Sequence, residues 1–100
     1  MSDSEILITD NPEAKRFEAR RDGTLLGFVE YIPLPGKIIA THTEVRRRFE
    51  GQGVGRTLLT GVVEQLRADG RLVQPLCPFF AAFLRDHPEH ADVVDPTTPR

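Results

Sequence analysis

Apolar and polar residues alternate along the first half of the chain in a way that predicts β-strands. In the stretch 15–21, Phe17 and Ala19 fall on one side of an extended segment. Asp22 and Gly23 follow, a pair that readily adopts the positive φ angles of a tight hairpin turn, and strand-like composition resumes at 24–32. These two stretches are therefore predicted to be antiparallel neighbours.

A third strand is expected at 37–45, after the prolines and glycine of 32–36 interrupt the pattern. Side chains of a strand alternate between the two faces of a sheet. This alternation predicts one face with Ile38, Ala40, His42 and Glu44, and an opposite face with Ile39, Thr41, Thr43 and Val45. The first of these faces thus has His42 and Glu44 as neighbours, roughly 7 Å apart along the strand.

The apolar residues change to helical spacing after residue 53. The positions that recur at this spacing are Val54, Leu58, Leu59, Val62, Val63 and Leu66. Asp69 and Gly70 supply a stop signal for this helix. Gly61 lies inside it at a cost of about 1 kcal/mol relative to alanine, which is tolerable where that face packs closely against a neighbour.

The remaining elements complete a βαβ unit. The stretch 71–76 is expected to be a short strand, and Pro78 is expected to open a second helix that ends before Pro88. We therefore expect an α/β fold: one compact domain with a mostly antiparallel, twisted sheet, a central βαβ unit and two main helices. The domain is expected at 5–94, with flexible segments at 1–4 and 95–100, which have no core residue.

Composition narrows the range of partners. The 100-residue chain has 13 basic and 15 acidic side chains and a net charge of −2, so nothing global attracts it to nucleic acid or to an anionic membrane. No apolar run approaches the roughly 20 residues that span a bilayer, and no secretory signal pattern opens the sequence. The single cysteine excludes an internal disulfide framework. These features predict a cytoplasmic protein, a monomer or weak dimer, without nucleic-acid or membrane partners.

The sequence "EGQGVGRT", from Glu50 to Thr57, has three glycines at every second position directly before the predicted helix. Glycines let an anion approach the backbone, and a helix N-terminus offers free N–H groups, so this loop suits a phosphate or pyrophosphate. A P-loop needs a Gly-Lys-Ser/Thr ending, and a dinucleotide-binding loop needs Gly-x-Gly-x-x-Gly after the first strand of a parallel sheet. The loop has neither pattern. Another nucleotide site, or a tight connection that binds nothing, remains an alternative.

The stretch from Glu50 to Gly55 resembles the acetyl-CoA pyrophosphate loop of the GCN5-related N-acetyltransferases, whose signature is Arg/Gln-x-x-Gly-x-Gly/Ala at the start of a long helix. The segments "HTEV", "FEGQGVG", "P-x-C-P-F" and "HPE" resemble the small single-domain, YjdJ-type branch of this superfamily, over roughly 27–94. The resemblance implies a GNAT-like acetyltransferase domain with acetyl-CoA as cosubstrate and no metal. The cofactor-binding residues that it implies are Val45, Arg46, Arg48, Gly51, Gln52, Gly53, Val54, Gly55 and Arg56.

Two features depart from the family pattern. Glu50 stands where the family has Arg or Gln, so an anion lies beside the expected pyrophosphate. The arginines expected to supply compensating charge are Arg46, Arg47, Arg48 and Arg56. In addition, only Asp22 and Gly23 lie between the first two predicted strands, where larger acetyltransferases have helices that cover the acceptor. The acceptor side is therefore expected to be open.

Cys77, His42 and Glu44 are the candidates for the chemistry. Cys77 lies just before Pro78, at a helix start that favours a reactive thiolate, so it is a candidate to accept the acetyl group covalently with His42 as its base. Alternatively, His42, or Glu44 through water, deprotonates an acceptor amine that attacks the thioester directly. Cys77 then only lines the pocket.

No metal site is expected, because His87 and His90 have no sulfur or carboxylate partners arranged for zinc. The expected function is transfer of an acetyl group from acetyl-CoA to an amine that the sequence does not identify. The alternative from a different class is a CoA-binding or protein-interaction module that has the same fold and no catalytic activity.

Overall fold

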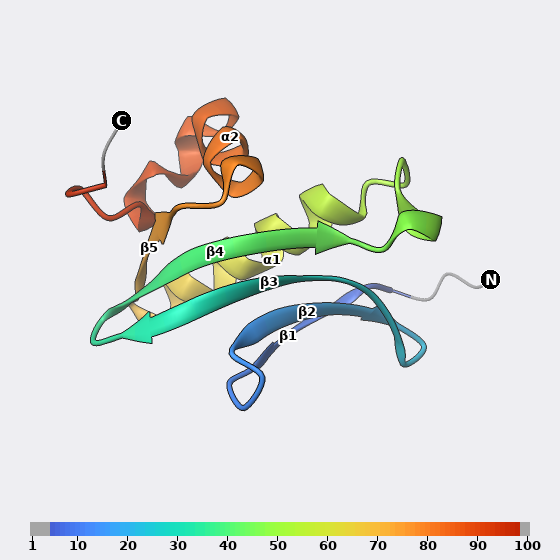
Figure 1. Cartoon of the computed structure of the whole chain (residues 1–100). Coiled ribbons are helices and arrows are strands. Elements are labelled where there is room, and N and C mark those ends of the chain that lie inside the picture. The colour runs from blue at the N-terminus through green and yellow to red at the C-terminus, as the bar shows by residue number, and fades with distance from the viewer. Residues whose placement is uncertain (1–4, 99–100) are drawn as a thin grey trace.

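The computed structural model describes residues 5–98, so the flexibility expected for 1–4 and for the last two residues of 95–100 lies outside the described residues. Five strands form one sheet in chain order, and the first three pairings are antiparallel while β4 and β5 run parallel (Figure 1). The strands are β1 (Leu7–Asn11), β2 (Arg16–Arg21), β3 (Thr24–Leu34), β4 (Lys37–Val45) and β5 (Leu72–Pro75). The mostly antiparallel sheet and its βαβ unit are confirmed.

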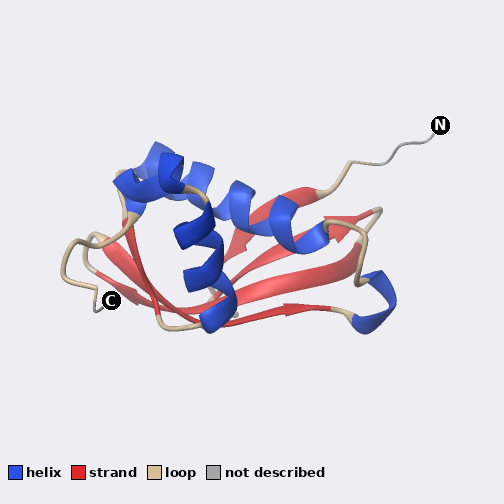
Figure 2. Cartoon of the chain, turned by 90° about the horizontal axis from the view of Figure 1, so that it is seen from above, coloured by secondary structure: helices blue, strands red, loops and turns tan. Residues whose placement is uncertain are grey.

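In the described part of the chain, two α-helices and two short 3₁₀ helices accompany the sheet. They are η1 (Arg47–Phe49), α1 (Val54–Asp69), α2 (Pro78–Asp86) and η2 (Pro88–Val93). The helix α1 lies along one face of the sheet, while α2 lies by the edge formed by β4 and β5 (Figures 1 and 2). Among the described residues, no helix covers the opposite face, here called the open face, and none is long and apolar enough to cross a membrane.

The predicted hairpin is present, with φ angles of 53° at Asp22 and 81° at Gly23. The expected interruption at 32–36 is wrong, because β3 continues to Leu34 and turns only at Pro35 and Gly36. The proline inside the strand is tolerated because the pairing of β2 with β3 ends at Glu30, so beyond that point β3 is an edge on that side.

The strand β1 was not predicted, since three of its five residues are polar. In the structure Leu7 is 61% exposed. Contacts far along the chain hold it in place. Gln65 of α1 donates a hydrogen bond to the Ile8 carbonyl (2.6 Å), and the Tyr31 hydroxyl donates one to Asp10 (2.6 Å). Because only 12–15 join β1 to β2, no covering helix lies between these strands either.

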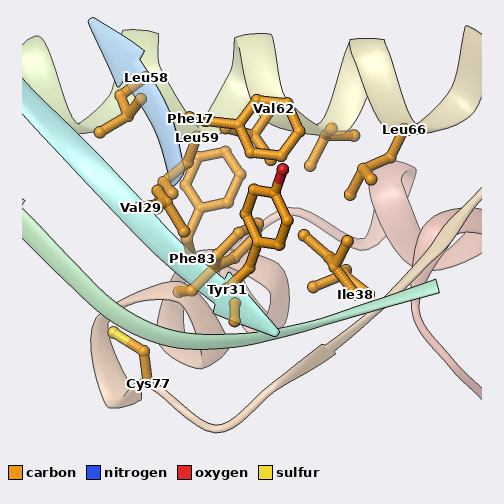
Figure 3. Close-up of a cluster of buried hydrophobic side chains, with 14 of the residues drawn as sticks. Phe17, Val29, Tyr31, Ile38, Leu58, Leu59, Val62, Leu66, Cys77 and Phe83 are labelled. Atoms are coloured by element: carbon orange, nitrogen blue, oxygen red, sulfur yellow. The ribbon is translucent and has the colours of Figure 1, made fainter. Parts of the chain in front are cut away.

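The core lies between α1 and the sheet (Figure 3). The apolar positions at helical spacing in α1 are all buried, which confirms this helix and its C-cap at Gly70. Gly61 faces β1 so closely that a Cβ there would lie 2.6 Å from Cγ1 of Ile8. The close packing expected at Gly61 is therefore confirmed.

The chain remains packed beyond Val94, contrary to a flexible tail that starts at Asp95. Asp95 is 6% exposed, its N–H donates to the Val73 carbonyl (2.9 Å), and Lys37 forms an ion pair with its carboxylate. A buried carboxylate is retained here because Lys37 and Thr97 satisfy its oxygens. This contact fastens the segment after η2 to β5 and β4.

We predict that Gly61→Ala destabilises the protein. The gain of about 1 kcal/mol in helix propensity is outweighed by overpacking, which costs about 1–3 kcal/mol. Urea unfolding measures the change. In an Ile8→Ala background the same substitution costs less, because Cγ1 and Cγ2 of Ile8, which lie 2.6 and 3.0 Å from the new methyl, are gone. An equal cost in both backgrounds would contradict the contact.

We predict that the stability lost in Asp95→Asn depends on pH. The hydrogen bond from Lys37, followed by those from Thr97, lowers the Asp95 pKa from 3.8 to about 2. The ionised form therefore stabilises the fold above pH 3.8, and this contribution is lost as the pH falls towards 2. Urea unfolding should show a deficit in Asp95→Asn at pH 7 that shrinks through this window. The exposed Asp86→Asn serves as the control, and a deficit that is independent of pH would refute the assignment.

Candidate active site

The strand β4 contains one extra residue at Thr41. Its partner β3 pairs Tyr31 with Ala40 and Glu30 with His42, so Thr41 has no opposite residue. The alternation expected along 37–45 is therefore wrong beyond Ala40. Thr43 turns towards the helices, whereas His42 and Glu44 lie on the open face and not with Ile38 and Ala40.

The strands β4 and β5 separate directly before this irregularity. Their pairing ends at Ala40 and Pro75. The Ala40 carbonyl then accepts hydrogen bonds from the N–H groups of both Leu76 and Cys77 (2.9 and 3.1 Å), and the chain turns into α2. Within the described residues, the rest of β4 consequently has no strand paired to it on the β5 side.

The backbone groups of Thr43 and Val45 point into this gap. Arg46 donates its N–H to the Leu26 carbonyl of β3 (2.7 Å), and in an antiparallel pair the backbone groups of successive residues point to opposite sides of the strand. Arg46 and Glu44 therefore direct their backbone groups towards β3. Thr43 and Val45, which alternate with them, direct their N–H and C=O groups away from β3. They form a short free strand edge.

The N-terminus of α1 faces the same gap. Its N-cap, Gly53, has a φ of 79°, and no side chain caps this end or places an acid in the first turn. The first hydrogen bond of the helix, from Thr57 to Gly53, leaves the N–H groups of Val54, Gly55 and Arg56 without helical partners. This helix start is suited to an anion.

Gly55 allows the two helix starts to approach each other. A Cβ at this position would lie 2.9 Å from the ring of Phe79, in the first turn of α2. Because the Phe79 side chain is half exposed, a larger residue at Gly55 would require this ring to move.

An open cavity of about 430 Å³ lies between the free edge of β4 and the two helix starts, a size typical of ligand sites. We call it the cleft cavity. Its lining residues are Thr43, Val45, Phe49, Glu50, Gly51, Gly53, Val54, Gly55 and Phe79.

Five of the expected cofactor-binding residues line the cleft cavity: Val45, Gly51, Gly53, Val54 and Gly55. The other four do not. Arg46, Arg56 and Gln52 are exposed, and Arg48 places its guanidinium 5.2 Å from the ring centroid of Phe49.

The arginines expected to balance Glu50 therefore do not line the cavity that Glu50 lines. Sequence reasoning did not assign Thr43, Phe49 or Phe79 to the site. The position of Thr43 depends on the extra residue at Thr41, which the sequence pattern does not reveal. Phe49 and Phe79 reach the cavity only through the tertiary fold.

The structure pairs His42 with Glu44 but not with Cys77. His42 Nε2 lies 3.3 Å from Glu44 Oε1, both side chains are about half exposed, and the His42 ring lies 6.1 Å from that of Phe28. Cys77 is buried, and its Sγ donates a hydrogen bond to Thr43 Oγ1 (3.3 Å). The cysteine thus lies behind the cleft cavity on the helix side of β4, across the strand from His42.

His87 and His90 stack with Phe83 at the end of α2, at centroid distances of 4.3 and 5.9 Å. Arg67 lies 3.3 Å from Nδ1 of His90 and pairs with Asp92. Within the described part of the chain, no group of three His, Cys, Asp or Glu side chains is arranged to hold a metal ion.

Known proteins share this architecture. The solution structure of a GCN5-like protein from Staphylococcus aureus, proposed to be an N-acetyltransferase, has 28% identity and a TM-score of 0.67, over 95% of this chain and 91% of that one. Ard1 from Thermoplasma volcanium has 22% identity and a TM-score of 0.53, over 66% of this chain and 45% of that one. A Desulfovibrio desulfuricans protein assigned to the GNAT family has 23% identity and a TM-score of 0.52, over 74% and 52%.

The last two similarities show the fold alone, and this chain spans about half the length of those proteins. A comparison with curated proteins finds no match. The sequence pattern of the GCN5-related N-acetyl-transferases, however, matches residues 16–93, which is most of the chain. Assignment to the YjdJ-type branch remains a prediction. The match over 16–93, on a fold shared with a GCN5-like protein, establishes that the chain belongs to the GCN5-related N-acetyl-transferase family.

Proposed function

We propose that the protein binds acetyl-CoA in the cleft cavity and transfers the acetyl group to an amine. The observation that carries this proposal is the free edge of β4 beside an uncapped helix start. A pyrophosphate fits the N–H groups of Val54, Gly55 and Arg56. The two amides of the pantetheine arm can pair with the backbone of Thr43 and Val45, as an added strand would.

Glu50 opposes this binding. Glu50 is one of the residues that line the cleft cavity, and no arginine or lysine is among the described residues of that lining. An anionic ligand is therefore held mainly by backbone dipoles and experiences repulsion from Glu50. We infer that this member of the family binds acetyl-CoA less tightly than its loop geometry permits.

The acetyl donor and the acceptor amine approach β4 from different sides. The thioester reaches the gap beyond Ala40 from the helix side, and the acceptor amine approaches from the open face, where His42 and Glu44 are exposed. His42 takes a proton from the amine, whose nitrogen attacks the acetyl carbonyl; the C–S bond then breaks and CoA leaves as the thiolate. Free N–H groups of β4 stabilise the oxyanion.

A covalent route through Cys77 is the competing mechanism. The thiol lies next to Thr43 of the cavity wall, but its hydrogen-bond partner is a hydroxyl, and His42 is on the other side of the strand. Direct attack therefore agrees better with the geometry. A protein that binds CoA without catalysis remains the alternative if no amine supports turnover.

We predict selective, salt-weakened binding of acetyl-CoA in calorimetric titrations, with ATP and NAD as controls. Glu50→Gln should tighten binding about three- to tenfold, because removing a like charge near the surface is worth on the order of 1 kcal/mol. Glu13→Gln makes the same change in net charge on the exposed β1–β2 turn and should have no effect. No binding at millimolar acetyl-CoA would overturn the proposed function.

We predict that His42→Gln lowers the turnover of an amine found by acceptor screening about 10²- to 10⁴-fold, while acetyl-CoA affinity is unchanged. Cys77→Ala should keep most of its activity, measured as release of the CoA thiol. In rapid-quench intact-mass spectra the wild type should show no acetyl adduct. An adduct that forms and decays at the rate of turnover, together with an inactive but folded Cys77→Ala, would establish the covalent route instead.

A further inference from the structure

Two side chains on the open face of the sheet are buried, although no helix among the described residues covers that face. Phe28 of β3 is 7% exposed and Glu18 of β2 is 4% exposed. Glu18 alternates with the core residues Phe17 and Ala19, which places it on the open face, and Phe28 is its partner on the neighbouring strand. Phe28 is buried without belonging to the core between α1 and the sheet. Side chains of the open face itself must therefore cover this pair.

Glu18 anchors the side chains around it. Its Oε2 accepts hydrogen bonds from Arg16 Nε (2.7 Å) and Asn11 Nδ2 (3.2 Å), and its Oε1 accepts one from Arg20 Nε (3.2 Å). Burial raises the Glu18 pKa, but these three hydrogen bonds together lower it below its usual value, so the group is a carboxylate at neutral pH. The charged Glu18 thus fixes the orientation of the Arg16 guanidinium.

Arg16 covers Phe28, and Phe28 contacts the proposed base. The guanidinium carbon of Arg16 lies 4.7 Å from the centroid of the Phe28 ring, which is a cation–π contact. The Phe28 ring lies 6.1 Å from the His42 ring at an interplanar angle of 57°, within the usual range of aromatic pairs. A series of contacts therefore leads from Glu18 to His42.

The orientation of His42 decides which of its nitrogens is the base. A carboxylate only accepts hydrogen bonds, so Nε2 of neutral His42, which lies 3.3 Å from Glu44 Oε1, has the proton. Nδ1 then has the lone pair that can take a proton from an amine. The His42 side chain is 52% exposed, so without its contact with Phe28 the ring is free to turn away from Glu44.

We propose that Phe28 is a positioning residue for His42, and that Glu18, through Arg16, holds Phe28 in place. This inference rests on the proposed function, in which His42 is the base. It extends the support of the reaction to β2, which β3 separates from β4. A misplaced base lowers the rate of the chemical step, so the expected effect is on turnover and not on the affinity for acetyl-CoA.

Nitrogen-15 NMR of the free protein tests the geometry at about pH 8, where histidine is neutral. The His42 signals are identified by their absence in His42→Gln. The wild type should have the proton on Nε2, and Phe28→Leu should show a mixture of the two tautomers. Glu18→Gln should change the same signals in the same direction. Val63→Ala, a buried position in α1 on the other face of the sheet, is the control for lost stability and should keep the wild-type signals.

Turnover of an amine found by acceptor screening tests the role in the reaction. Phe28→Leu should lower kcat about ten- to hundredfold, a part of the 10²- to 10⁴-fold that a general base contributes. Acetyl-CoA affinity should be unchanged. In a His42→Gln background, Phe28→Leu should cost nothing further, because residues that act as one unit have non-additive effects.

The outcomes separate this inference from the proposed function. Unchanged His42 signals in Phe28→Leu overturn the inference and leave the proposed function intact. An equal loss of kcat from Phe28→Leu in the wild-type and His42→Gln backgrounds also overturns it, because Phe28 then acts independently of His42. Where Phe28→Leu or Glu18→Gln does not fold, Arg16→Met, at a side chain that is 25% exposed, breaks the same series of contacts and should change the same signals. If no amine is turned over, the proposed function fails, and the spectra alone decide whether Phe28 orients His42.

Discussion

The separation of β4 from β5 after Ala40 is the constraint on which the rest of this site depends. The Ala40 carbonyl accepts two N–H groups, which ends the parallel pairing and sends the chain into α2. The extra residue at Thr41 then changes which side chains face the helices. As a result, β4 has a free edge towards the cleft cavity, and its His42–Glu44 pair lies on the open face of the sheet.

The elements around the cleft cavity are held by contacts elsewhere in the fold. A row of fully buried side chains anchors α1, and Gly61 lets that helix approach β1 closely. On the other side of the cavity, Phe80 and Phe83 fasten α2 to the core, and Asp95 ties the segment after η2 to β5. The helix starts are therefore positioned mainly by packing away from the cleft cavity, which leaves the first N–H groups of α1 without helical partners and available to an anion.

The local pattern of the sequence was sufficient for the hairpin at Asp22 and Gly23, for α1 and for the βαβ order, because turn chemistry and helical spacing are properties of neighbouring residues. It failed where distant contacts decide the structure. Polar residues make up much of β1, and tertiary hydrogen bonds hold it. Asp95, near the end of the chain, can be buried because it forms an ion pair with Lys37, which lies far from it in the sequence.

The same limit applies to the candidate site. The glycines of the loop were recognisable, and five of the nine expected binding residues line the cleft cavity. The irregularity at Thr41 could not be recognised from the sequence, since a single inserted residue leaves no signal in the composition. It moved His42 to the open face and brought Thr43, which the sequence did not single out, to the cavity beside Cys77.

The most direct test of the account is a titration of the isotope-labelled protein with acetyl-CoA, followed by backbone amide NMR. The amides of 43–45 and 51–56 are expected to shift together with one affinity, while those of β1 and the β1–β2 turn do not move. Absence of shifts at saturating ligand, or shifts confined to a surface away from β4 and the start of α1, would contradict it.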